Sequence, residues 1–172
     1  MRKWSSRLEV AAMTFALLAV AGGLSAPSAH GKEVAYTKHA RQTLSETKGD
    51  PGYPGTGELA QQIFLDTAID APGDFPVVEV RVYNQDNTVA GNGMHRGYEV
   101  HIFKNGDRAY TRYEGTHKVT TKEGGAWEVT YEGTQTYVGG TGRYRDIKGP
   151  GTYKGRITPD SFQEENKWNV TY

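Results

Sequence analysis

From residue 58 onward the chain alternates apolar and polar residues in short runs, and this pattern constrains its fold more than any other feature. The runs are rich in Val, Thr, Tyr and Ile and recur between turn residues about every ten positions. No long stretch here has the 3.6-residue period of a helix. We therefore expect an all-β sandwich or barrel, with strands over residues 58–69, 75–83, 97–103, 108–120, 126–138, 144–149, 151–158 and 167–172.

The glycine-rich segment YVGGTGRYRDIKGPGTYKG, residues 137–155, is interpreted as a corner of the sheet. A phosphate-binding P-loop needs a GK[ST] sequence before a helix, and the chain contains none. The dinucleotide pattern GxGxxG also fails, because Arg145 follows Gly140 and Gly142 at its third position. Glycines at bends and bulges are what closure of a sheet into a barrel requires.

The N-terminus has the composition of a secretory signal peptide. Arg2, Lys3 and Arg7 precede the apolar stretch of residues 10–24, and the small-residue run SAPSAHG follows it. We expect residues 1–31 to be removed on export, with cleavage after Ala26, Ser28, Ala29 or Gly31. An uncleaved membrane anchor is the alternative.

Charge and cysteine content exclude several classes of function. Residues 32–172 hold 17 basic and 19 acidic residues, a net charge of −2, which gives no electrostatic basis for binding nucleic acid or an anionic membrane surface. The chain has no cysteine, hence no disulfide, thiol nucleophile or thiolate ligand. After signal cleavage we therefore expect an exported protein that depends on its core for stability and associates with neither nucleic acid nor membrane.

Residues 32–57 are polar and end in a Gly and Pro cluster. They are predicted to be an arm or lid, with a short helix over TKHARQTLSE, residues 37–46, or else a disordered leader. The barrel domain is placed at residues 58–172.

The GGTGRY sequence at residues 139–144 resembles a C-terminal hairpin of the dirigent and allene oxide cyclase superfamily, including small exported bacterial members. The resemblance covers about residues 56–172. It implies an eight-stranded antiparallel β-barrel, often dimeric or trimeric, with a central cavity for an apolar small molecule. The plant members steer radical coupling or cyclise an epoxide, but their cavity residues cannot be matched to this chain one by one.

Strand alternation predicts which residues line the barrel. The inward face is expected to carry Val78, Val80, Val82, Tyr98, Val100, Ile102, Thr111, Tyr113, Trp127, Val129 and Tyr131. This set is either a packed core or a ligand pocket, and Tyr98, Tyr113, Trp127 and Tyr131 are its candidate ligand-binding residues. A bulge that reversed the alternation would instead turn Arg81, His101 and Arg112 inward, where they would polarise a ligand.

The sequence predicts no metal, cofactor or hydrolytic site. His95, His101 and His117 lack the spacing that places two ligands on one helix face, and Ser161 has no GxSxG motif around it. Three functions stay open: a small-molecule binder, an isomerase or cyclase that controls ligand conformation, and a structural protein with a filled barrel. An inward Arg, His or Glu in a deep pocket would favour the enzyme.

Overall fold

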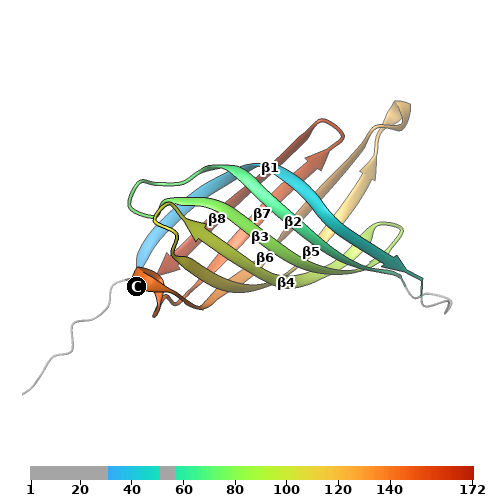
Figure 1. Ribbon diagram of the computed structural model, residues 1–172. Helices are drawn as coiled ribbons and strands as arrows, with labels where there is room; N and C mark the ends of the chain where they lie inside the picture. Colours follow the sequence, from blue (N-terminus) through green and yellow to red (C-terminus); the bar gives the residue numbers. More distant parts are fainter. Residues whose placement is uncertain (1–30, 51–56) are drawn as a thin grey trace, which may run out of the picture.

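A computed structural model describes residues 31–50 and 57–172. These described residues form eight antiparallel strands that close into one barrel in the order β1 to β8, with β8 pairing back onto β1 (Figure 1). The predicted fold class is therefore confirmed. The strands are β1 (Lys32–Gly49), β2 (Glu58–Asp70), β3 (Val77–Val89), β4 (Asn92–Phe103), β5 (Arg108–Thr121), β6 (Trp127–Gly140), β7 (Gly149–Thr158) and β8 (Ser161–Val170), with 3-10 turns η1 (Glu123–Gly125) and η2 (Gly142–Tyr144).

The segment predicted as a polar arm is instead the first strand of the barrel. Lys32–Gly49 pairs with β2 on one side and β8 on the other, so neither an arm nor a helix over residues 37–46 is present. The prediction was wrong because the inward positions of β1 include Lys38 and Arg41 as well as Val34 and Tyr36. Polar residues at inward positions conceal the alternation that identifies a strand.

The glycine-rich segment forms a corner, as predicted, although residues 144–149 are not a strand. β6 ends at Gly140, the chain turns through η2, and β7 begins at Gly149. Gly142 has a φ of 52° and Gly149 a φ of 138°, conformations that residues with a Cβ rarely adopt. Between them Tyr144 and Ile147 turn inward and are fully buried. The corner therefore reverses the chain and also contributes two side chains to the hydrophobic core.

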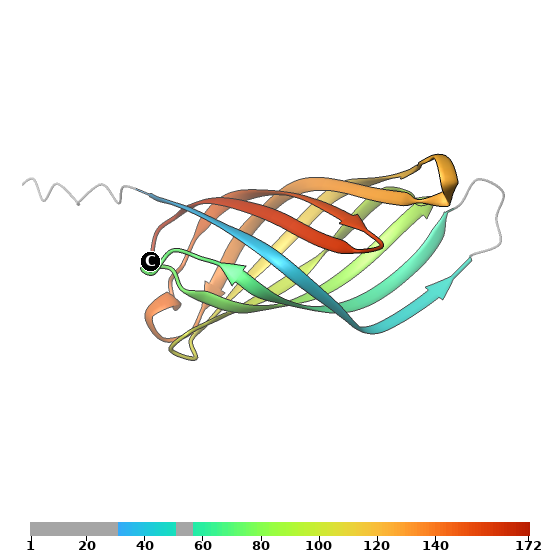
Figure 2. The same ribbon diagram turned by 90° about the horizontal axis from the view of Figure 1, so that it is seen from above.

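One end of the barrel is filled by aromatic side chains. The connections β2–β3, β4–β5 and β6–β7 lie at this end, together with the start of β1 and the C-terminus (Figure 2). Phe75 packs edge-on against Phe103 at 5.0 Å between ring centroids, and Phe103 stacks on Tyr144 at 3.6 Å. The end of β1, the start of β2 and the β3–β4, β5–β6 and β7–β8 hairpins lie at the opposite end. We call the first end the filled end and the second the open end.

Inward glycines make room for aromatic rings that lie across the barrel. Each of four glycines is paired directly with an aromatic residue on a neighbouring strand, and a Cβ on the glycine would overlap that side chain. The pairs are Gly97 with Tyr113, Gly133 with Tyr153, Gly155 with Tyr131 and Gly151 with Trp168. Rings placed over glycines in this way favour sheet curvature and fix the strand register.

In the part of the chain that the structure describes, no helix has the length and hydropathy needed to cross a membrane. The predicted signal peptide lies outside the described residues except for Gly31.

Candidate functional site

The inward face agrees with the predicted alternation on two strands and reverses it on a third. Val80 and Val82 of β3 and Thr111 of β5 are buried, as predicted. Val78 was also predicted inward but is 46% exposed, because an irregularity between Val77 and Glu79 places Val77 inside instead. On β4 the inward side chains are Glu99 and His101 rather than Tyr98, Val100 and Ile102. The prediction for β4 assumed an apolar interior, whereas the middle of this barrel is charged.

The structure separates the four candidate ligand-binding residues. Tyr113 and Tyr131 lie inside the barrel, 8% and 9% exposed. Tyr98 is 64% exposed on the outer face, and Trp127 is 41% exposed at the tip of the β5–β6 hairpin, which projects beyond the barrel (Figure 1). The alternative polar cluster does not form either, because His101 is buried while Arg81 and Arg112 face solvent.

A charged layer centred on Lys38 crosses the middle of the barrel. The Lys38 ammonium is fully buried and lies 2.7 Å from Glu164, 2.9 Å from Glu99 and 3.3 Å from Asp66. Burial alone would lower the pKa of Lys38, but these carboxylates raise it well above its usual range. The three carboxylates could themselves hold a metal ion, and the ammonium of Lys38 already supplies the cation that they need.

Arg41 forms the second cationic group of this layer. Its guanidinium donates two hydrogen bonds to the Asp66 carboxylate, at 2.6 and 2.7 Å, in a bidentate arrangement. It also lies 3.4 Å from Glu164. It is also held between the rings of Phe64 and Phe162, at 4.8 and 4.4 Å from their centroids. Arg41 is therefore fixed in both position and orientation.

His101 connects the charged layer to the filled end. Its Nε2 lies 2.9 Å from Glu99 and its Nδ1 lies 2.7 Å from the Tyr137 hydroxyl. Burial lowers the pKa of His101 in spite of the hydrogen bond to Glu99, which acts to raise it. The ring therefore serves mainly to satisfy buried hydrogen-bonding groups.

A cavity of about 300 Å³ occupies the open half of the barrel, above the charged layer. Aromatic and aliphatic side chains form its walls, among them Phe64, Val82, Tyr113, Tyr131, Tyr153 and Ile157. Arg41, Glu99 and Glu164 from the charged layer also line it. The combination of aromatic and aliphatic walls with polar groups that are held in fixed positions is typical of small-molecule sites.

Three tyrosine hydroxyls in this cavity are held by hydrogen bonds. Tyr131 donates to Glu164 at 2.9 Å, and Tyr113 donates to Asn84 at 2.7 Å. The Tyr153 hydroxyl lies 2.7 Å from His95 Nε2. Burial raises the pKa of all three phenols, so they stay protonated at neutral pH.

Asp86, His95 and His117 meet on the cavity wall near the open end, an arrangement that the sequence did not predict. Asp86 on β3 pairs directly with His95 on β4, and His117 on β5 is the diagonal neighbour of His95. Burial, aided by the charges of His117 and Arg41, lowers the pKa of His95 to about 4. The spacing of ligands along one helix was the wrong criterion for this group, because the register between three strands brings it together.

A larger hollow of about 830 Å³ lies on the outer face of the barrel, lined by Tyr83, Tyr98 and Arg112 among others. Many of its lining side chains are polar, among them Gln61, Gln85 and Arg96. The outer position explains why Tyr98 and Arg112 do not contribute to the interior site. The interior cavity is lined by buried aromatic and aliphatic side chains together with a few fixed charged groups, as small-molecule sites usually are, so the interior is the better candidate.

Comparison with known proteins gives no relative from which a function could be transferred. No family model matches the chain, and no curated protein or solved structure matches it significantly.

Proposed function

We propose that this barrel binds a small, largely apolar molecule in the cavity at its open end. The observation that carries the proposal is the interior volume of about 300 Å³, which adjoins the charged layer. The walls offer aromatic surface, and Arg41, Tyr131 and Glu164 offer fixed polar groups that would orient one polar end of the ligand. The existence of the cavity favours this function over that of a structural protein with a filled barrel.

The proposal is tested with a small apolar fluorescent probe, N-phenyl-1-naphthylamine. We expect its emission to rise on binding to the purified protein, and Val82→Trp to weaken that binding at least tenfold by filling the cavity. Val82 is 3% exposed and lines the cavity, whereas Val138 is 57% exposed on the outside. Val138→Trp is therefore the matched control and should bind the probe as the unaltered protein does.

Native mass spectrometry of the exported protein identifies the natural ligand and the number of copies in the assembly. We expect an adduct of a few hundred daltons that Val82→Trp loses and Val138→Trp keeps. Probe binding that is insensitive to Val82→Trp, in a variant with an unchanged far-ultraviolet circular dichroism spectrum, would refute the interior site.

A second candidate function is an isomerase or cyclase of the dirigent or allene oxide cyclase type. The observation that favours it is the cluster of Arg41, Tyr131 and Glu164 beside the cavity, because fixed donors and charges stabilise developing charge in a transition state. Inward Arg and Glu side chains are the feature expected of the enzyme, but Arg41 and Glu164 are already paired with Asp66 and Lys38, so we place binding first. Geometry of binding, rather than a nucleophile or metal, would then control the product. If the molecule captured from cells changes to an isomer during incubation, Glu164→Gln should slow that change while probe binding persists.

Export and self-association are part of the same proposal. The basic residues, apolar stretch and small residues of positions 1–31 support export, which N-terminal sequencing of the protein from culture medium tests. Exposed Tyr83 and Tyr98 are cross-strand partners on the outer face, which favours contact with a second copy.

A further inference from the structure

We propose that Asp86, His95 and His117 form a binding site for one divalent transition-metal ion, such as Zn²⁺, on the wall of the cavity. One imidazole nitrogen from each histidine and one Asp86 carboxylate oxygen all lie within 4.8 Å of one another. This inference is independent of the apolar ligand, since the metal would be held by side chains alone.

The distances between these atoms favour a shared metal over a direct hydrogen bond. The Nδ1 atoms of His95 and His117 are 3.4 Å apart, which is long for a hydrogen bond. Two nitrogens bound to one tetrahedral Zn²⁺ at about 2.1 Å each would lie about 3.4 Å apart. The Asp86 oxygen is 4.0 Å from His117 Nδ1, about 0.6 Å more than the same geometry requires for that pair.

Neighbouring side chains already orient the ligands. His95 Nε2 lies 2.7 Å from the Tyr153 hydroxyl; when Nε2 donates this bond, the lone pair of Nδ1 faces its partners. Asn84 donates to the Asp86 carboxylate at 2.8 Å and is itself held by Tyr113 at 2.7 Å. Metal sites in proteins use such outer hydrogen bonds to fix the tautomer and direction of each ligand.

The backbone leaves the space that this arrangement needs. Gly115 is the direct partner of His95 on β5, and a Cβ at that position would crowd both His95 and Tyr153. The missing side chain lets the His95 ring lie against Tyr153 and face His117, whose ring is nearly parallel to it.

Two nitrogens and one carboxylate oxygen suit divalent ions of intermediate softness, such as Zn²⁺ and Co²⁺, more than Ca²⁺ or Mg²⁺, which prefer oxygen alone. Three protein ligands are one fewer than a closed structural zinc site uses. The fourth position would open onto the cavity that these three residues line, where water or a donor atom of a ligand would occupy it.

The test uses purified protein that has been treated with EDTA and then freed of chelator. Zn²⁺ is titrated in competition with a chromophoric chelator, and Co²⁺ binding is followed by its visible absorption. We expect one equivalent to bind, and His117→Ala and Asp86→Asn each to weaken binding at least tenfold. Tyr153→Phe keeps all three ligands but removes the hydroxyl that orients His95, so it should weaken binding roughly tenfold.

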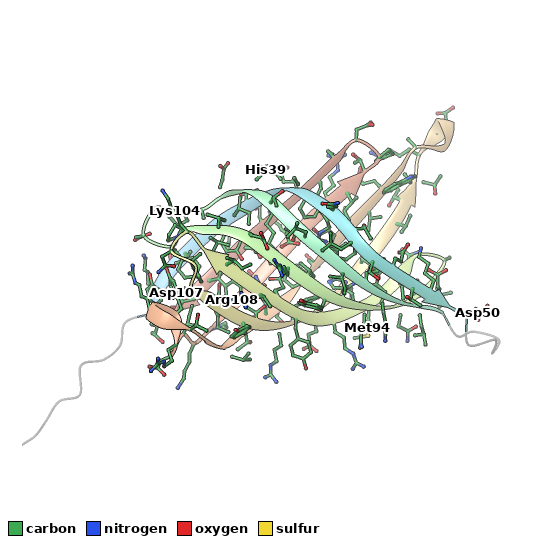
Figure 3. All side chains as sticks on the ribbon, viewed as in Figure 1. His39, Asp50, Met94, Lys104, Asp107 and Arg108 are labelled. Carbon is green, nitrogen blue, oxygen red and sulfur yellow. The ribbon has the colours of Figure 1, made fainter. Side chains whose placement is uncertain are left out.

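His39→Ala is the matched control, because His39 also lies beside a carboxylate, Asp70, but with 43% of its side chain exposed on β1 (Figure 3). It should bind the metal as the unaltered protein does. Uptake below one equivalent by the unaltered protein, or equal affinity in a folded His117→Ala or Asp86→Asn variant, would overturn the proposal. Val82→Trp should lose the apolar probe but keep the metal, so failure of one proposal is distinguishable from failure of the other.

Discussion

The filled and open ends of the barrel are enclosed by the same strands but differ in what their connections contribute. At the filled end, Phe75 from the β2–β3 connection and Tyr144 and Ile147 from the β6–β7 connection are buried, and Phe75 and Tyr144 pack on Phe103. At the open end, the η1 hairpin residues are exposed and the interior keeps a cavity. The difference indicates that inward strand residues alone leave space in a barrel of this size, and that a loop is needed to fill it.

The charged layer lies between the filled and open ends, and we expect a substitution there to change the stability of the barrel most. Lys38→Met should destabilise the fold by about 3–5 kcal/mol, because it removes the ammonium that lies between three buried carboxylates and leaves Arg41 to balance Asp66 and Glu164. Urea unfolding measures the change. Lys118→Met on the exposed face of β5 is the control and should stay within about 0.5 kcal/mol. A loss below 1 kcal/mol for Lys38→Met would mean that water reaches the layer and screens it.

Truncation of one phenylalanine at each end measures the difference directly. Phe103→Ala should cost about 3–5 kcal/mol, because Phe103 is 1% exposed and stacked on Tyr144. Phe64→Ala, on the cavity wall, should cost about 1–2 kcal/mol because less packing is lost there. Both values come from urea unfolding, and equal costs would contradict the distinction between a filled and an open end.

The corner that fills one end can be broken at a single glycine. Gly142→Val should cost about 1–3 kcal/mol, because Gly142 has a φ of 52° and a Cβ there would overlap the Asp107 carboxylate that accepts a bond from Arg143 N. Asp107 lies at this end of the barrel (Figure 3). Gly106→Asn is the control, since Gly106 also has a positive φ but has open space around it. Unchanged thermal stability of Gly142→Val would refute the role of the corner.

The charged layer should make the barrel sensitive to acid. Burial would raise the pKa of Glu99, but Lys38 and His101 lower it well below its usual range, so its stabilisation is present above about pH 4.3 and is lost as the pH falls. The pKa of His101 is also lowered, so the barrel loses further stability as the pH falls below about 6.5. Urea midpoints should therefore fall between pH 7 and pH 3.5. Glu99→Gln should be less stable at pH 7 and show a smaller fall below pH 5.

The fold was predictable from sequence where the interior is apolar. Alternation identified β3, β5 and β6, and the glycine-rich corner was recognised because turn glycines act locally. β1 and the direction of β4 were not predictable in this way, because Lys38, Glu99 and His101 occupy inward positions that hydrophobic patterning assigns to the outside. Their burial depends on partners contributed by β1, β2, β4 and β8.

The candidate site was predictable only in part, for a related reason. Tyr113 and Tyr131 were found because both alternation and residue type place them inside. The meeting of Asp86, His95 and His117 depends on the pairing of Asp86 with His95 and of Gly93 with His117. Such pairings are set by strand register, which a single sequence does not specify.

The pairing of β1 with β8 has a consequence for how this chain folds. Val34 lies opposite Trp168, so the contact that seals the sheet joins positions roughly 130 residues apart. Until β8 has been synthesised and docked, the free edge of β1 offers unsatisfied peptide groups to any neighbouring chain. A nascent polypeptide of this kind folds late and slowly, and it gains from being kept apart from other copies until its last strand arrives.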